Sequence, residues 1–111
     1  MQKFMVMYLA PAEMMQEWMK KPEAERKAEE MKMQTEWKVW MEAHGAMIHE
    51  TNATGKTTRI TKDSVAPARN DLMLYSVVEG ESAEAVAEIF KGHPHFGIPD
   101  ATIEIMPIRP M

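Results

Sequence analysis

The sequence predicts one α+β domain, residues 1–111, in which helices cover one face of an antiparallel sheet. The length suits a single domain. Apolar, strand-like runs open and close the chain at residues 3–10 and 102–108. Between them, helical patterns at residues 22–43 and 82–90 alternate with strand candidates in the middle of the chain. The resulting order of elements is β-α-β-β-α-β, the ferredoxin-like pattern.

The opening strand, KFMVMYLA at residues 3–10, is apolar on both of its faces. Alternation places Phe4, Val6 and Tyr8 on one face and Met5, Met7 and Leu9 on the other. A strand with two apolar faces is covered on both sides, so we expect it at the centre of the sheet.

The first long helix is predicted to begin at Pro22 and to end near Gly45. Proline is favoured at the first helical position, and Gly45 is expected to supply a left-handed cap. A short helical turn at residues 14–19 precedes it. At 100° per residue the helix carries two stripes on nearly opposite sides. One stripe can pack on the sheet, and the other suggests contact with the preceding segment or with another subunit. The stripes consist of Met33, Trp37, Trp40 and His44 on one side, and of Ala28, Met31, Thr35 and Val39 on the other.

The middle of the chain contains three strand candidates, at residues 46–50, 57–61 and 71–79. The last of these, DLMLYSVVE, is rich in residues that favour strands. We interpret residues 62–70, which include Pro67, as a polar loop.

A short second helix and a final strand complete the pattern. Ser82 is a good N-cap for the helix, and Gly92 and Pro94 end it. In the final strand Ile103 and Ile105 should face the core, whereas Thr102, Glu104 and Met106 should face the other way.

The second face of the sheet predicts a homodimer. It carries Met5, Met7 and Leu9, or their alternates, and an apolar patch of this size marks an interface or a binding site. Pairing two such sheets face to face would bury both patches.

The composition excludes several classes of function. The net charge of −4 argues against a nucleic-acid or anionic-membrane surface, because phosphate binding needs clustered Lys and Arg. The chain has no cysteine, so thiolate metal sites are excluded and a cytoplasmic location is expected. No segment approaches the roughly 20 apolar residues of a membrane helix.

His93 and His95 flank Pro94 just after the second helix. One interpretation is a solvated helix cap. The functional alternative is general acid–base chemistry, since imidazole titrates near neutral pH. A metal site would need a third ligand such as His49 or Glu104, and two histidines at this spacing are weak evidence for one. The methionines, 13 in all, are interpreted as adaptable core filling rather than as copper ligands.

Two carboxylates are notable for their placement. Asp71 precedes the third strand, and Glu104 points toward the space between paired sheets. An acid inside a mostly apolar barrel would have a raised pKa and could carry a proton. The alternative for Glu104 is an edge strand, where an outward glutamate discourages aggregation.

Five segments form a distinctive set: the opening strand, the helix end AHGA at residues 43–46, the run NDLMLYSVVE at residues 70–79, the motif HPHF at residues 93–96 and the run IEIMPI at residues 103–108. With them nearly the whole chain resembles the YCII-related family, most strongly from Asn70 onward. The resemblance implies a dimeric α+β barrel. That superfamily includes small-molecule isomerases, dehalogenating enzymes and monooxygenases that often need no cofactor, so none is expected.

Some family members are thought to use a histidine on the first helix with an aspartate in an Asp-Pro-Tyr motif after the second. Here the corresponding positions hold Gln34 and the run His93-Pro94-His95. If a site persists in that cleft, His93 is its titrating group and Gln34 a hydrogen-bonding one. The catalytic candidates are thus His93, His95 and Asp71, and the substrate-binding candidates are Gln34, Trp37, Tyr75 and Glu104.

Three hypotheses about function follow. The first is a cofactor-independent enzyme that uses histidine acid–base chemistry on a small molecule, as a lyase, isomerase or dehalogenase-like protein. The second is a non-catalytic dimeric binding or accessory domain, favoured by the missing helix histidine. The third, and weakest, is a His/Met metal-binding protein. Convergence of His93 and Gln34 on one cavity would favour the first over the second.

Overall fold

The computed structural model describes residues 1–111. Its elements follow the order β1 (Gln2–Leu9), α1 (Ala12–Met19), α2 (Glu23–His44), β2 (Ile48–Ala53), β3 (Thr57–Ile60), β4 (Val65–Ala68), β5 (Leu72–Gly80), α3 (Ala83–Phe90) and β6 (Thr102–Pro107). Short 3₁₀ turns at Gly45–Met47 and Pro94–Gly97 follow α2 and α3.

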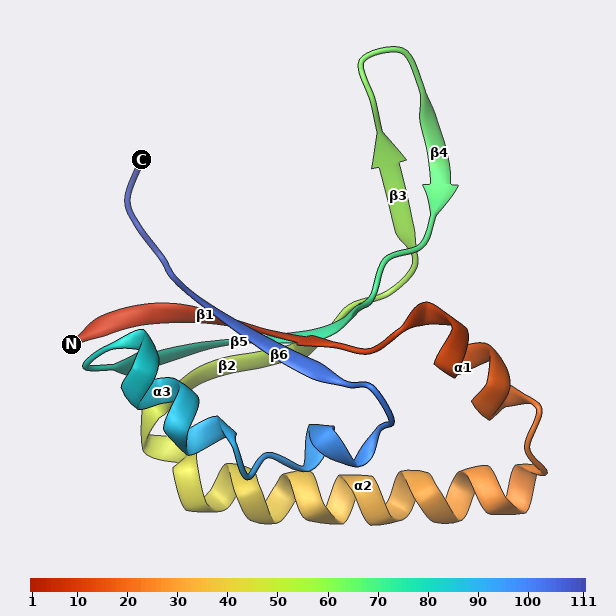
Figure 1. Cartoon of the computed structure of the whole chain (residues 1–111), viewed down its shortest axis with the longest axis horizontal. Helices are drawn as coiled ribbons and strands as arrows, with labels where there is room; N and C mark the ends of the chain where they lie inside the picture. The colour runs from red at the N-terminus through yellow and green to blue at the C-terminus, as the bar shows by residue number, and fades with distance from the viewer.

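Four strands form an antiparallel sheet in the order β2-β5-β1-β6. The predicted fold class is confirmed, since this is the ferredoxin-like order and both α2 and α3 lie on one side of the sheet (Figure 1). The central position predicted for β1 is also confirmed, because β1 pairs with β5 on one edge and β6 on the other. None of the helices is long and apolar enough to cross a lipid bilayer.

The core lies between the sheet and the two helices. The β1 side chains Phe4, Val6 and Tyr8 are buried there, together with Val78 of β5, Trp40 of α2, and Val86 and Phe90 of α3. Ile103 and Ile105 of β6 pack against this cluster, as predicted. The two-residue period of the strands and the apolar stripe of α2 therefore account for the main packing layer.

The ends of the helices show one confirmed prediction and one error. Ser82 caps α3, since its Oγ accepts a hydrogen bond of 3.1 Å from the backbone N–H of Ala85. The left-handed cap predicted at Gly45 is wrong. Gly45 has a φ of −58°, in the right-handed region, and the chain tightens there into a 3₁₀ turn instead of reversing through a positive φ.

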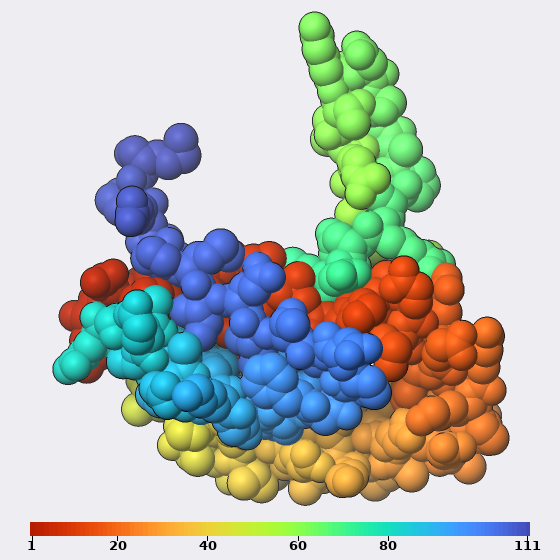
Figure 2. Space-filling view, in the orientation of Figure 1, coloured from red at the N-terminus to blue at the C-terminus, as the bar shows by residue number.

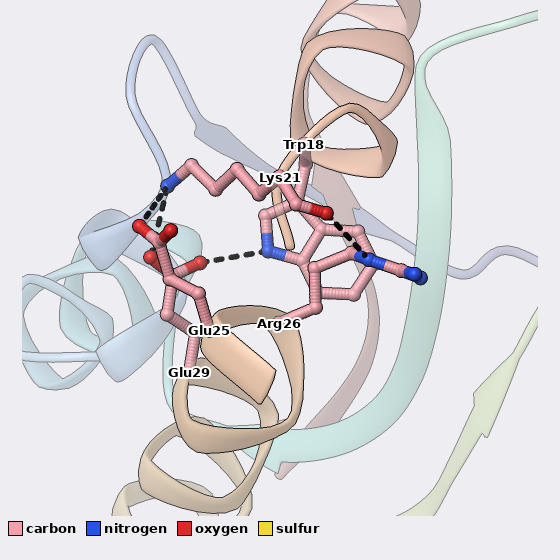
Figure 3. A network of polar contacts seen from close by, with 5 residues as sticks. All are labelled: Trp18, Lys21, Glu25, Arg26 and Glu29. Carbon is pink, nitrogen blue, oxygen red and sulfur yellow. Dashed lines mark hydrogen bonds and ion pairs between the residues drawn. The ribbon is translucent and has the colours of Figure 1, made fainter. Parts of the chain in front are cut away.

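Helix α1 rests on the start of α2 through polar contacts, with no buried residue of its own. The indole Nε1 of Trp18 donates to Glu29 Oε2 at 2.8 Å, and Lys21 Nζ lies 2.8 Å from Glu29 Oε1 (Figure 3). Arg26 completes the group by donating from Nε to the Lys21 carbonyl at 3.2 Å. The hydrogen bond from Lys21, with a smaller effect of the one from Trp18, lowers the pKa of Glu29.

Residues 55–70 form an arm that leaves the sheet between β2 and β5. In it β3 pairs with β4 as a separate two-stranded sheet. The prediction of a loop over residues 62–70 is therefore wrong at Val65–Ala68, where pairing with β3 fixes a strand despite Pro67. The arm and the C-terminal tail both project from the side of the sheet away from α2 and α3 (Figures 1 and 2).

No helix covers the second face of the sheet (Figure 1). Met5, Met7 and Leu9 lie on it and are half-buried, as is Val77 of β5. Burial of this face by a second copy of the chain stays a prediction.

Candidate active site

His93 lies inside a cluster of aromatic rings. Its ring centroid is 4.3 Å from that of Trp37, 4.4 Å from Trp40, 5.0 Å from Tyr8 and 5.7 Å from Phe90. The interpretation as a solvated cap is wrong, because only 2% of His93 and 1% of His95 is exposed. The apolar stripe of α2 explains the burial, since Trp37 and Trp40 close over the turn that follows α3.

The hydrogen bonds of His93 define its tautomer. The backbone N–H of His95 donates to His93 Nδ1 at 2.9 Å, so Nδ1 carries a lone pair and a neutral ring carries its proton on Nε2. That Nε2 is buried without a conventional hydrogen-bond partner. The surrounding rings can accept a weak N–H···π hydrogen bond. Burial, with smaller effects of His95 and His44, lowers the pKa of His93 to about 3.

His95 is held by the end of β1. Its ring Nε2 lies 2.8 Å from the carbonyl oxygen of Leu9, which can only accept, so Nε2 donates. Burial lowers the pKa of His95, while hydrogen bonds with the backbone at Leu9 and Thr102 act in the opposite direction. A ring anchored in this way has one orientation.

A cavity of about 410 Å³ lies between α2, the start of β5 and the turn that holds His95. Its lining includes Gln34, Trp37 and His95, which the sequence analysis proposed, but not His93. The remaining lining residues are Met33, Lys38 and Met41 of α2, Met73 and Leu74 of β5, and Ile98. Lys38 was not predicted as a site residue, although its position four residues after Gln34 puts both on one flank of α2.

Tyr75 and Glu104 lie on the other face of the sheet. Both are cross-strand partners of Met7, whose side chain points away from the core formed by Val6 and Tyr8. The Tyr75 hydroxyl accepts from Asn52 Nδ2 at 3.1 Å. The sheet therefore separates these two candidates from the cavity that contains His95.

Asp71 lies outside the cavity as well. It is exposed, and its Oδ1 accepts a hydrogen bond of 3.1 Å from the backbone N–H of Ala12 in the first turn of α1. A carboxylate stabilises a helix N-terminus in this position, because the first N–H groups have no partner within the helix.

A chain of three hydroxyls crosses the sheet on the core side, and the sequence analysis did not anticipate it. The Tyr8 hydroxyl lies 2.8 Å from Ser76 Oγ, which lies 2.7 Å from Thr51 Oγ1. Burial raises the pKa of Tyr8 to about 12, although the hydrogen bond to Ser76 opposes the shift. Tyr8 also lies against both histidines, with ring centroids 5.0 Å from His93 and 5.5 Å from His95.

Of the other two histidines, His44 borders the ring cluster around His93 through Trp40, and His49 lies apart from it. His44 packs against Trp40 with ring centroids 4.5 Å apart, and His49 Nε2 lies 3.2 Å from Glu79 Oε1. No group of three or more His, Asp or Glu side chains is arranged so that it could hold a metal ion.

No protein-family model and no curated protein matches the sequence. Among solved structures, the chain is similar to 5-chloro-2-hydroxyhydroquinone dehydrochlorinase (TftG) from Burkholderia phenoliruptrix AC1100, in complex with 2,5-dihydroxybenzoquinone. The TM-score is 0.57 at 12% identity, over 98% of this chain and 94% of the other. At this identity the likeness shows a shared α+β fold, and it spans both chains almost completely.

Proposed function

We propose that this protein is a homodimeric, YCII-related protein that binds a small molecule in the cavity beside α2. The observation that carries the proposal is the meeting of Gln34, Trp37 and His95 on one cavity. Gln34 and Trp37 of α2 meet a histidine that lies far along the sequence, and Gln34 occupies the position where the family resemblance puts its helix histidine. A volume of about 410 Å³ lies within the range of small-ligand sites.

The lining favours a flat, largely apolar ligand with one acidic or carbonyl group. Six of the nine lining residues are hydrophobic, and Trp37 offers an aromatic surface. Gln34 and Lys38 are exposed on α2, where an amide and a cation could bind an oxygen of the ligand. The lining contains no carboxylate to repel an anion.

The uncovered second face of the sheet supports the homodimer. Met5, Met7, Leu9 and Val77 form an apolar surface there, and pairing with a second copy would remove it from water. The family resemblance implies the same arrangement.

A second candidate is cofactor-independent acid–base catalysis, as in a lyase, isomerase or dehalogenase-like enzyme. The anchored ring of His95 favours it, since Nε2 donates to the Leu9 carbonyl and a neutral ring then has its lone pair on Nδ1, where it could accept a proton. Burial lowers the pKa of this ring, which favours the neutral form. TftG, which has the same fold, is a dehydrochlorinase. In this mechanism His93 is a positioning residue, because its Nδ1 binds the backbone N–H of His95.

Titration calorimetry with 2,5-dihydroxybenzoquinone and hydroxylated benzoates tests binding. Lys38→Met should weaken the affinity for an anionic probe at least five-fold. Lys32→Met, on the same helix but outside the cavity, should change it less than two-fold. Equal effects of the two substitutions, or no binding of any probe, would contradict the proposed site.

Chloride release from chlorinated hydroxyhydroquinones tests catalysis separately. Turnover that is lost in His95→Asn, while the affinity for the probe is kept, supports an acid–base role. Binding without turnover in the wild-type protein assigns the cavity to binding alone.

A further inference from the structure

One face of the arm of residues 55–70 exposes large apolar side chains that nothing covers. Its cross-strand pairs place Thr58 opposite Pro67 and Ile60 opposite Val65, so these four side chains share one face. Ile60 is 75% exposed and Val65 68% exposed. A two-stranded hairpin is marginally stable alone in water and needs a surface to pack against. The arm is therefore expected to pack against another surface.

The charge of the arm is opposite to that of the body. Lys56, Arg59, Lys62 and Arg69 against Asp63 give the arm a net charge of +3. Because the whole chain carries −4, the remaining residues, which we call the body, carry −7. The basic arm of one protomer would therefore be attracted to the acidic body of a second copy. The same acidic body would repel a nucleic acid, which disfavours a polyanion as the partner.

The place of the arm is continuous with the proposed dimer interface. The arm rises from the sheet on the side away from the helices (Figure 1). Met5, Met7 and Val77 lie on the same side of the sheet. The strand spacing of about 3.3 Å per residue gives the limb from Gly55 to Thr61 a reach of about 20 Å. That reach exceeds the roughly 10 Å that separates two packed sheets.

We propose that the arm of each protomer clasps the body of the second copy, burying Ile60 and Val65 against it and setting its basic residues against the partner's acidic surface. Docking uses the side-chain face of the hairpin, because Pro67 in β4 removes a backbone donor that strand addition would need. This inference rests on the proposed homodimer and adds a second contact that lies outside the paired sheets.

Photo-crosslinking tests the clasp directly. The chain has no cysteine, so a Val65→Cys variant carries one thiol for benzophenone maleimide. A mixture of ¹⁴N- and ¹⁵N-labelled protein should yield, on irradiation, covalent dimers that contain both isotopes. The matched control is Lys32→Cys, exposed on α2, which should give little dimer. Crosslinks that stay within one chain would overturn the proposal.

Sedimentation equilibrium separates the clasp from the dimer itself. Replacing both Ile60 and Val65 by serine should raise the dimer dissociation constant at least ten-fold, and Met7→Lys on the sheet face should abolish the dimer. An unchanged constant in the arm variant contradicts the clasp and leaves the sheet-face dimer standing. A wild-type chain that stays monomeric at 100 μM contradicts both, whatever the cavity binds.

Discussion

The backbone N–H of His95 donates a hydrogen bond of 2.9 Å to Nδ1 of His93. This contact joins two buried histidines that have different surroundings. His93 is enclosed by aromatic rings, whereas His95 reaches the cavity beside α2 and is anchored to the Leu9 carbonyl. The two histidines of one His-Pro-His turn therefore have different surroundings, the first within the core and the second at the wall of the cavity.

The enclosure of His93 predicts a pH-dependent stability. Burial lowers the pKa of His93 from 6.5 to about 3, so between these values the unfolded chain binds a proton that the folded chain does not. Stability is therefore fully present above pH 6.5 and falls as the pH drops toward 3. From pH 6.5 to pH 4.5 this one group should remove roughly 2 kcal/mol of unfolding free energy.

Urea unfolding at fixed protein concentration measures this dependence. His93→Phe places another apolar ring beside Phe90 and has no group to protonate, so its stability should vary less with pH than that of the wild type. The variant should be less stable at pH 7, because the N–H of His95 loses its acceptor. Equal losses in the two proteins on acidification would contradict the assignment.

Gly80 should tolerate no side chain. A Cβ at this position would lie 2.4 Å from Cγ2 of the buried Val86, and a β-branched side chain has few rotamers with which to withdraw. We expect Gly80→Ala to lower the unfolding free energy by about 1–3 kcal/mol, the usual cost of overpacking. Gly92→Ala is the control, since a Cβ there meets nothing within 4 Å. A neutral Gly80→Ala would contradict this close approach of β5 and α3.

Gly45 should show the opposite behaviour. Its φ of −58° suits any L-residue, and a Cβ there meets nothing within 4 Å. Gly45→Ala should therefore stabilise the fold by roughly 0.4–1 kcal/mol, because alanine reduces the conformational freedom of the unfolded chain. A left-handed cap, which the sequence suggested, would make the same substitution destabilising. Thermal denaturation of the variant distinguishes the two.

Sequence patterns correctly predicted those elements whose structure depends on residues close together in the sequence. The two apolar faces of β1, the Ser82 cap and the alternation of β6 all depend on residues within one element. Strand β4 was not predicted because Val65–Ala68 becomes a strand only by pairing with β3. Gly45 was misjudged because glycine permits a positive φ without requiring one.

The candidate site was predicted in part, for the same reason. Gln34 and the His93–His95 turn were singled out together, and the fold does bring Gln34 and His95 to one cavity. Which histidine would face the cavity could not be read from the sequence. That depends on Trp37 and Trp40, which lie more than fifty residues earlier and enclose His93 only after α2 packs on the sheet.

The hydroxyl chain of Tyr8, Ser76 and Thr51 should show unequal costs of substitution. Ser76→Ala leaves the buried Tyr8 hydroxyl without its partner and should cost about 1–3 kcal/mol. Tyr8→Phe removes the hydroxyl itself, and Ser76 keeps its bond to Thr51, so the cost should be roughly 0.5–1.5 kcal/mol. The double variant should then be less destabilised than the sum of the two, which urea unfolding can measure. Strict additivity would show that the 2.8 Å contact contributes nothing.

The contact between Trp18 and Glu29 should control the docking of α1 rather than the stability of the whole fold. Helix α1 has no buried residue, and this indole hydrogen bond of 2.8 Å joins it to α2 (Figure 3). Trp18→Phe keeps an aromatic ring but removes the donor. Amide hydrogen exchange in residues 12–19 should become faster, while the global unfolding free energy changes by less than about 1 kcal/mol. Glu17→Gln, which removes the exposed pair with Lys20, is the control and should leave exchange in α1 unchanged. Equal exchange rates in wild type and Trp18→Phe would mean that α1 is held by other contacts.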